Sequence, residues 1–235
     1  MTVVIFILIS ALLTLLPLFL ASRRKNHFGN ILALLHHYCH PSYFVTKIHT
    51  LLKAEESKAQ SKSIVPLRLY LGIGLYACGR FQEAMKTLEG IEFCYHYKNA
   101  GFIARYFHFK FLIALEIERQ DVAWGSLVNM RQALANIRKR KALRIFSTIY
   151  NEDMHILNVV RNQCEGAEEV LQGMLARSQS NYERSFASYQ LGELYRQLGK
   201  EAEAKDAYMD VLAYGNKLYI AGKSAERLGL NGWEA

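Results

Sequence analysis

The sequence predicts an all-α protein in which one N-terminal transmembrane helix is followed by a helical-repeat superhelix of about four helix pairs. Three observations predict this class. Residues 3–21 form an uninterrupted apolar run, the remaining chain repeats apolar residues at helical spacing, and two distant segments share one pattern of glycine and alanine. Only three prolines occur in 235 residues and the last is Pro66, so long helices can form from there on.

The apolar run over residues 3–21 predicts a transmembrane helix, because a helix needs about 20 apolar residues to cross a bilayer. Arg23, Arg24 and Lys25 follow it, and such basic flanks stay on the cytoplasmic side. We therefore expect a single-pass membrane protein that contacts lipid through residues 3–25, with its repeat domain on the cytoplasmic side and a bacterial inner membrane favoured. A cleaved signal peptide is disfavoured because no basic residue precedes the run.

Residues 22–62 are predicted to form juxtamembrane helices and a linker. One short helix covers 27–38, and a second covers 43–59. One cluster in this region could in principle bind a metal ion, and the sequence does not decide whether it does. No Cys or His pair follows it at the spacing of a zinc finger, so we expect no metal. That cluster of imidazole and thiolate groups consists of His36, His37, Cys39 and His40.

Residues 63–218 are predicted to form the repeat domain, with a capping helix and tail over 219–235. Two segments in it each contain Leu-Gly, a second glycine seven residues later and an alanine twelve residues later. We expect the first glycine and the alanine to let two antiparallel helices approach closely, and the second glycine to end the first helix. The predicted packing residues are Leu71, Gly72, Gly79, Ala84, Leu191, Gly192, Gly199, Ala204 and Tyr208.

This pattern resembles the tetratricopeptide repeat (TPR) family, whose unit is a helix, a tight turn and a second helix. The two signatures stand three units of about 40 residues apart, so the middle units are degenerate, and longer repeats of the HEAT kind are the fallback. The resemblance implies a scaffold or adaptor whose groove binds another protein and so assembles or regulates a membrane complex.

Two kinds of TPR protein have more specific roles, and each role depends on residues that can be looked for in this sequence. Bacterial membrane-anchored TPR proteins that regulate envelope glycolipid assembly are similar in architecture, and such a regulator is one alternative; they also carry a four-cysteine zinc module that this sequence lacks. TPR proteins that hold acidic C-terminal peptides use Lys and Asn on their inner helices. That role is not expected here, because the corresponding faces carry Leu69, Ile73, Tyr189 and Glu193.

A nucleotide-binding enzyme is the other alternative. Gly72, Gly74 and Ala77 follow an apolar run over residues 64–71, in the spacing of a dinucleotide-binding loop. Pro66 lies inside the strand that this motif requires, which argues against it.

The sequence shows no set of nucleophile, base and orienting group, no metalloprotease motif and no phosphate-binding loop of the P-loop type. Glu152, Asp153 and His155 form the only compact group of acids and imidazole, and we expect them on a solvated helix surface. The sequence therefore predicts a protein that is not an enzyme and has no cofactor.

The densest charge feature is a predicted turn between two helices. The chain has a net charge of +8, which favours acidic partners. We expect the turn to contact an acidic protein, such as a subunit of a membrane complex, or anionic lipid. Nucleic acid is not expected, because no platform of basic and aromatic residues is evident. The turn consists of Arg138, Lys139, Arg140, Lys141 and Arg144.

Overall fold

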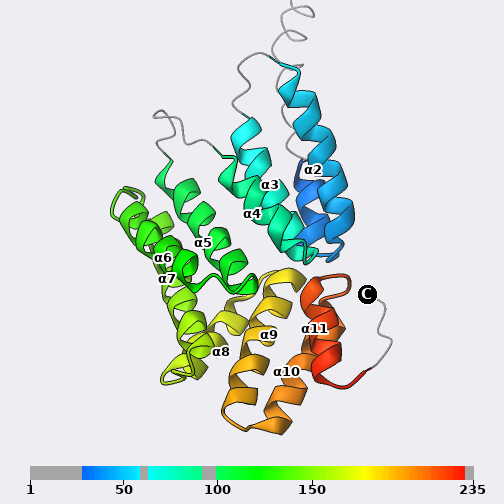
Figure 1. Ribbon diagram of the computed structural model, residues 1–235, viewed down its shortest axis with the longest axis vertical. Coiled ribbons are helices and arrows are strands. Elements are labelled where there is room, and N and C mark those ends of the chain that lie inside the picture. Colours follow the sequence, from blue (N-terminus) through cyan, green and yellow to red (C-terminus); the bar gives the residue numbers. More distant parts are fainter. Residues whose placement is uncertain (1–27, 59–62, 92–98, 231–235) are drawn as a thin grey trace, which may run out of the picture.

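The computed structural model describes residues 28–58, 63–91 and 99–230, and every regular element in these ranges is an α-helix (Figure 1). Residues 28–36 form the first described helical segment. The helices that follow are α2 (Pro41–Glu56), α3 (Ile64–Ala77), α4 (Phe81–Glu89), α5 (Ala100–Glu116), α6 (Gln120–Leu134), α7 (Arg140–Val160), α8 (Ala167–Arg177), α9 (Asn181–Gln197), α10 (Glu201–Tyr214) and α11 (Tyr219–Arg227).

The predicted fold class needs a correction. None of the helices in the described ranges combines the length and the apolar character that crossing a membrane requires. The part of the chain that the structure describes is therefore all-α and contains no such helix. Residues 3–21, on which that helix was predicted, and its basic flank Arg23, Arg24 and Lys25 lie outside the described residues.

The helices between α3 and α10 follow one another as a repeat-like series of pairs. Within a pair the two helices pack together, as α3 does with α4, α5 with α6, α7 with α8 and α9 with α10. The first helix of each pair also packs against the first helix of the next pair. Each pair therefore covers the apolar face of its neighbour, which is the packing principle of helical repeats.

The same turn ends the first helix of all four pairs. At each of these turns one residue has a left-handed backbone, and the amide of the following residue donates to a carbonyl five residues earlier, as Arg80 does to Leu75 and Lys200 to Tyr195. These turns recur at intervals of about 40 residues. The left-handed residues are Gly79 (φ 76°), Glu118 (φ 58°), Asn162 (φ 59°) and Gly199 (φ 70°).

Two glycines bring the helices of the first and last pairs into contact. A Cβ added to Gly72 would lie 2.6 Å from Leu88 Cδ2, and one added to Gly192 would lie 2.5 Å from Tyr208 Cε1. Ala84 and Ala204, on the facing helices, are buried. A larger side chain at either glycine would therefore collide with the partner helix.

The helices that were predicted to lie beside a membrane, within residues 22–62, belong to the same core as the repeats. Phe44 and Ile48 of α2 are fully buried, and α2 packs against α3. Leu35 and Cys39 of the preceding segment are buried too. The apolar positions of this region, which the sequence pattern placed beside a membrane, therefore cover the first repeat.

Candidate binding surface at the turn between α6 and α7

The inner helix faces, where a TPR-type protein would hold its partner, are covered in this chain. Leu69 and Ile73 of α3 and Tyr189 of α9 are at most 5% exposed. Glu193 is engaged from both sides, since Arg227 Nε donates to its Oε1 at 2.9 Å and Tyr208 Oη at 2.7 Å. Burial would raise the pKa of Glu193, but these hydrogen bonds hold it below its usual value.

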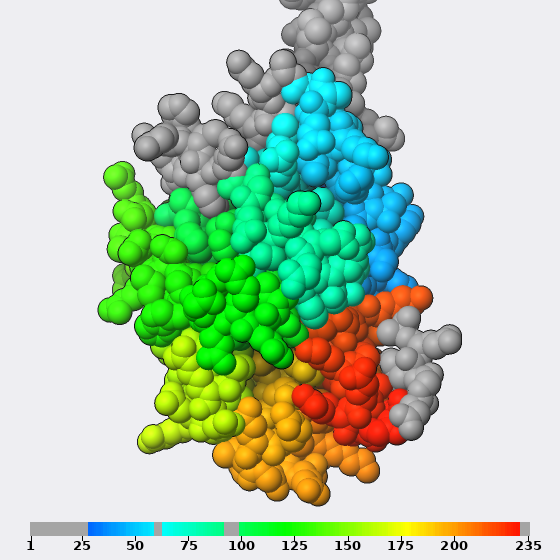
Figure 2. Space-filling view, viewed as in Figure 1, coloured from blue at the N-terminus to red at the C-terminus, as the bar shows by residue number. Residues whose placement is uncertain are grey.

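Hydrogen bonds connect the segment before α2 with the last helix pair and the residues that follow it. The Asn181 side chain donates to the carbonyl of His37, and the Asn216 side chain donates to that of Tyr38. The backbone amide of Lys217 donates to the carbonyl of Cys39. On the face shown in Figure 2, atoms of α4 rest against those of α11 and the segment before it.

A polar cluster joins α3, α5 and α11. Tyr219 Oη lies 2.8 Å from Tyr76 Oη and donates to Glu116 Oε1 at 2.9 Å. Lys223 Nζ donates to Glu116 Oε2 at 2.5 Å. Burial raises the pKa of both tyrosines far above its usual value, so they remain neutral hydrogen-bonding groups. These hydrogen bonds hold α11 against both α3 and α5.

The basic turn, by contrast, is open to solvent. Arg138 and Lys139 connect α6 to α7, and the other three basic residues lie in the first two turns of α7. All five side chains, Arg138, Lys139, Arg140, Lys141 and Arg144, are exposed. Within the described parts of the chain none of them is paired with a carboxylate. Their positive charge is thus available to a partner.

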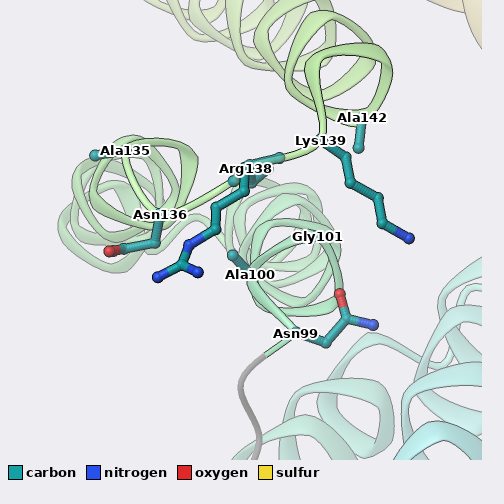
Figure 3. Close-up of a pocket in the computed structure, with 9 residues that line it drawn as sticks. Asn99, Ala100, Gly101, Ala135, Asn136, Arg138, Lys139 and Ala142 are labelled. Atoms are coloured by element: carbon teal, nitrogen blue, oxygen red, sulfur yellow. The ribbon is translucent and has the colours of Figure 1, made fainter.

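A surface pocket of about 770 Å³ lies at this turn. Figure 3 shows Arg138 and Lys139 extending on either side of the first turn of α5, at Ala100 and Gly101. No carboxylate is among the lining residues that the structure describes. They come from the start of α5, the end of α6 and the start of α7, and are Asn99, Ala100, Gly101, Ala135, Asn136, Ile137, Arg138, Lys139 and Ala142.

The local packing explains why the three helix ends meet here. Ala104 of α5 and Met130 of α6 are fully buried against each other's helix, with Phe146 of α7 packed on them. A Cβ on Gly101 would lie 3.0 Å from the Phe146 ring, so the absent side chain lets α7 pass close to the start of α5. Asn99 begins α5 and accepts a hydrogen bond from the amide of Phe102 at 3.2 Å. The pocket is therefore built on packed helix ends.

Glu152 and Asp153 are buried rather than on a solvated helix surface, which corrects the prediction, and His155 is half-buried. Asp153 is 1% exposed and faces α5, where both of its oxygens lie within 3.0 Å of His108 Nδ1. Glu152 is buried and pairs with Arg177 of α8. Burial raises the pKa of Asp153 and Glu152, against the opposing effects of His108 and Arg177. The prediction failed because the partners lie on other helices.

The glycine motif that suggested nucleotide binding lies inside a helix. Gly72, Gly74 and Ala77 are buried residues of α3, and the apolar run before them belongs to the same helix. A Cβ on Gly74 would lie 2.7 Å from the Phe44 ring, so α2 occupies the space in front of that glycine. There is accordingly no loop here whose amides could hold a phosphate.

The histidine and cysteine cluster is divided between different environments. The His36 ring packs on Tyr182, and burial lowers its pKa. Cys39 is buried, which raises its pKa to about 12. In the described ranges no three Cys, His, Asp or Glu side chains lie together as a metal ion would require.

These features define the class of the described chain as a helical-repeat-like all-α fold with an exposed basic pocket. No protein-family model, curated protein or solved structure matches it. The pocket residues contributed by α5 escaped the sequence reasoning, because they are about 40 residues away from the basic turn. Asn99 carried a usable signal, since an asparagine directly before an apolar run predicts the start of a helix.

Proposed function

We propose that the protein is an interaction scaffold of the helical-repeat type, and that it binds an acidic segment of another protein at the basic turn. The observation that carries the proposal is the group of five exposed basic side chains without described carboxylate partners, beside a pocket whose described lining residues include no acid. The residues named on the inner helix faces are buried or hydrogen-bonded, and this supports the exposed basic turn as the binding surface. The recurring turn at the end of each first helix supports the repeat architecture and its TPR-like character.

Electrostatics favour a carboxylate-rich partner. Unpaired cations attract such a segment and speed its association, and Arg138 can hold a carboxylate through two hydrogen bonds. Because the five side chains are exposed, salt will screen them, and the affinity should fall as ionic strength rises.

A charge-reversal experiment tests the proposal. Replacing Arg138, Lys139, Arg140 and Lys141 by Glu in the full chain should weaken binding of a fluorescent nine-residue glutamate peptide by more than about tenfold, since each removed cation becomes a repelling anion. Fluorescence anisotropy at low and at physiological salt measures the dissociation constant.

A dispersed variant with the same change in net charge is the control. Lys53, Lys86, Arg119 and Lys205 are exposed and belong to other elements, so changing them to Glu should alter the dissociation constant by less than about threefold. Equal weakening by the two variants, or no binding of the peptide to the native chain, would refute the proposed function.

A further inference from the structure

One face of α2 is an exposed polar stripe, which we call the α2 stripe. The helix lies at the outer edge of the molecule (Figure 1), and it packs against α3. Its apolar residues Phe44, Ile48 and Leu52 are buried. The exposed residues recur three or four positions apart, so they follow one another along a single side of the helix. They are Ser42, Tyr43, Thr46, His49, Thr50 and Lys53.

The α2 stripe carries positive charge that no acid neutralises. The first Asp or Glu in the chain is Glu55, so no carboxylate precedes the last turn of α2. Among the described residues, neither Lys47 nor Lys53 is paired with a carboxylate. The two acids that end the helix are each paired with a cation of their own. The stripe therefore attracts a polyanion.

Two exposed tyrosines stand where the α2 stripe begins. Tyr43 is 52% exposed, and Tyr38, in the segment that leads into α2, is 61% exposed. Lys47 Nζ lies 4.9 Å from the centre of the Tyr43 ring. The Asn216 side chain donates to the Tyr38 carbonyl and lies 3.4 Å from His40 Nε2, so the residues before α11 hold this segment in place. Aromatic rings are thus offered to a ligand beside the cations.

From this combination we infer that the α2 stripe binds single-stranded nucleic acid, a partner distinct from the acidic protein segment at the basic turn. Proteins that bind single strands combine cations that follow the phosphates with aromatic rings on which the bases stack. Lys47, His49 and Lys53 supply the first part, and the rings of Tyr38 and Tyr43 supply the second. An acidic peptide would use the charge but has no planar bases to stack on the rings.

This inference reverses the expectation that no nucleic acid binds. That expectation rested on the lack of a basic and aromatic platform in the sequence. The residues of the platform are spread over positions 38 to 53 and are separated by apolar residues. Only the helical backbone of α2 gathers those within it on one side.

The test compares two fluorescein-labelled strands on the full chain: an eight-nucleotide oligothymidylate, and an abasic strand with the same phosphates. Attraction by charge alone binds the two strands equally. The native chain should bind the oligothymidylate about tenfold more tightly, which is the effect of about one stacked base. Fluorescence anisotropy measures both dissociation constants.

Three variants locate the stacking. Tyr38→Ser with Tyr43→Ser should abolish the preference for oligothymidylate, whereas Tyr38→Phe with Tyr43→Phe should keep it, because the ring faces remain. Trp124→Ser is the matched control, since Trp124 is an exposed aromatic residue on a different helix, α6, and its loss should leave the preference unchanged. Circular dichroism checks that each variant keeps its helices.

The outcomes separate this inference from the proposed function. Equal affinity of the native chain for the two strands, or no binding of either, would overturn the inference. A preference that survives the serine variant but is lost when residues 138–141 are replaced by Glu would assign the strand to the basic turn, and would overturn it too. The glutamate peptide should bind the serine variant as tightly as the native chain, so the acidic-partner function is judged independently.

Discussion

Replacing Asp153 by Ala is expected to lower the free energy of unfolding by about 2–3 kcal/mol, because the change leaves a buried polar group without its hydrogen-bond partner. Asp153 is almost fully buried, and its partner His108 has a side chain that is only 16% exposed. The substitution leaves a cavity and an imidazole with no partner at the contact between α5 and α7. Urea denaturation followed by circular dichroism measures the loss.

Glu152 is the matched control for Asp153, because it is the neighbouring acid on the same helix. Its partner Arg177 is 53% exposed and can return to water, so Glu152→Gln should cost less than about 1 kcal/mol. If the two variants were equally stable, the burial of the Asp153 pair would not matter energetically, and the structural account of this contact would be wrong.

The burial of the Asp153 carboxyl group gives a pH dependence with a defined sign. Burial raises the pKa of Asp153 in the folded state above its unfolded value. Its carboxyl group therefore contributes most to stability below the unfolded pKa, and this contribution is lost as the pH rises through the folded pKa. The stability of the native chain relative to the Asp153→Asn variant should accordingly grow as the pH is lowered.

The Gly192→Ala variant is expected to lose about 1–3 kcal/mol, the usual cost of overpacking a core. The added Cβ would lie 2.5 Å from Cε1, 2.8 Å from Cδ1 and 2.9 Å from Cζ of Tyr208. That ring cannot move freely, because it is 3% exposed and its hydroxyl donates to Glu193. The contact between α9 and α10 would have to open.

Gly125 provides the comparison, since it lies inside α6 and a Cβ there meets nothing within 4 Å. Gly125→Ala should stabilise the chain by up to about 1 kcal/mol through helix propensity alone. Thermal unfolding of the two variants under identical conditions distinguishes the cases. A Gly192→Ala chain that melted together with the Gly125→Ala chain would show that α9 and α10 do not pack as described.

The sequence was sufficient for the local parts of this fold. Apolar spacing identified the helices, and the glycines at 72 and 192 lie at the close helix contacts that the pattern suggested. It was insufficient for the middle turns, because Glu118 and Asn162 take the left-handed conformation without the glycine that would reveal it. A turn formed by an ordinary residue leaves no mark in the sequence pattern.

The contacts between residues far apart in the chain could not be predicted from the sequence. The contact between Tyr219 and Tyr76 joins residues 143 positions apart, and the pocket joins the start of α5 to the turn after α6. Apolar periodicity shows which face of a helix is covered, but the covering element remains unknown. The basic turn could be singled out as a charge cluster, whereas its pocket depended on helices that only the fold brings together.

The central claim is that the basic turn, and not the inner helix face, binds the partner. Hydrogen–deuterium exchange of the full chain, with and without the nine-residue glutamate peptide, tests this claim. Bound peptide should slow exchange at residues 99–102 and 135–145 and leave α3 and α9 unchanged. Protection concentrated in α3 and α9, with no effect at the basic turn, would contradict the account, because it would mean that the helix series opens and binds its partner inside.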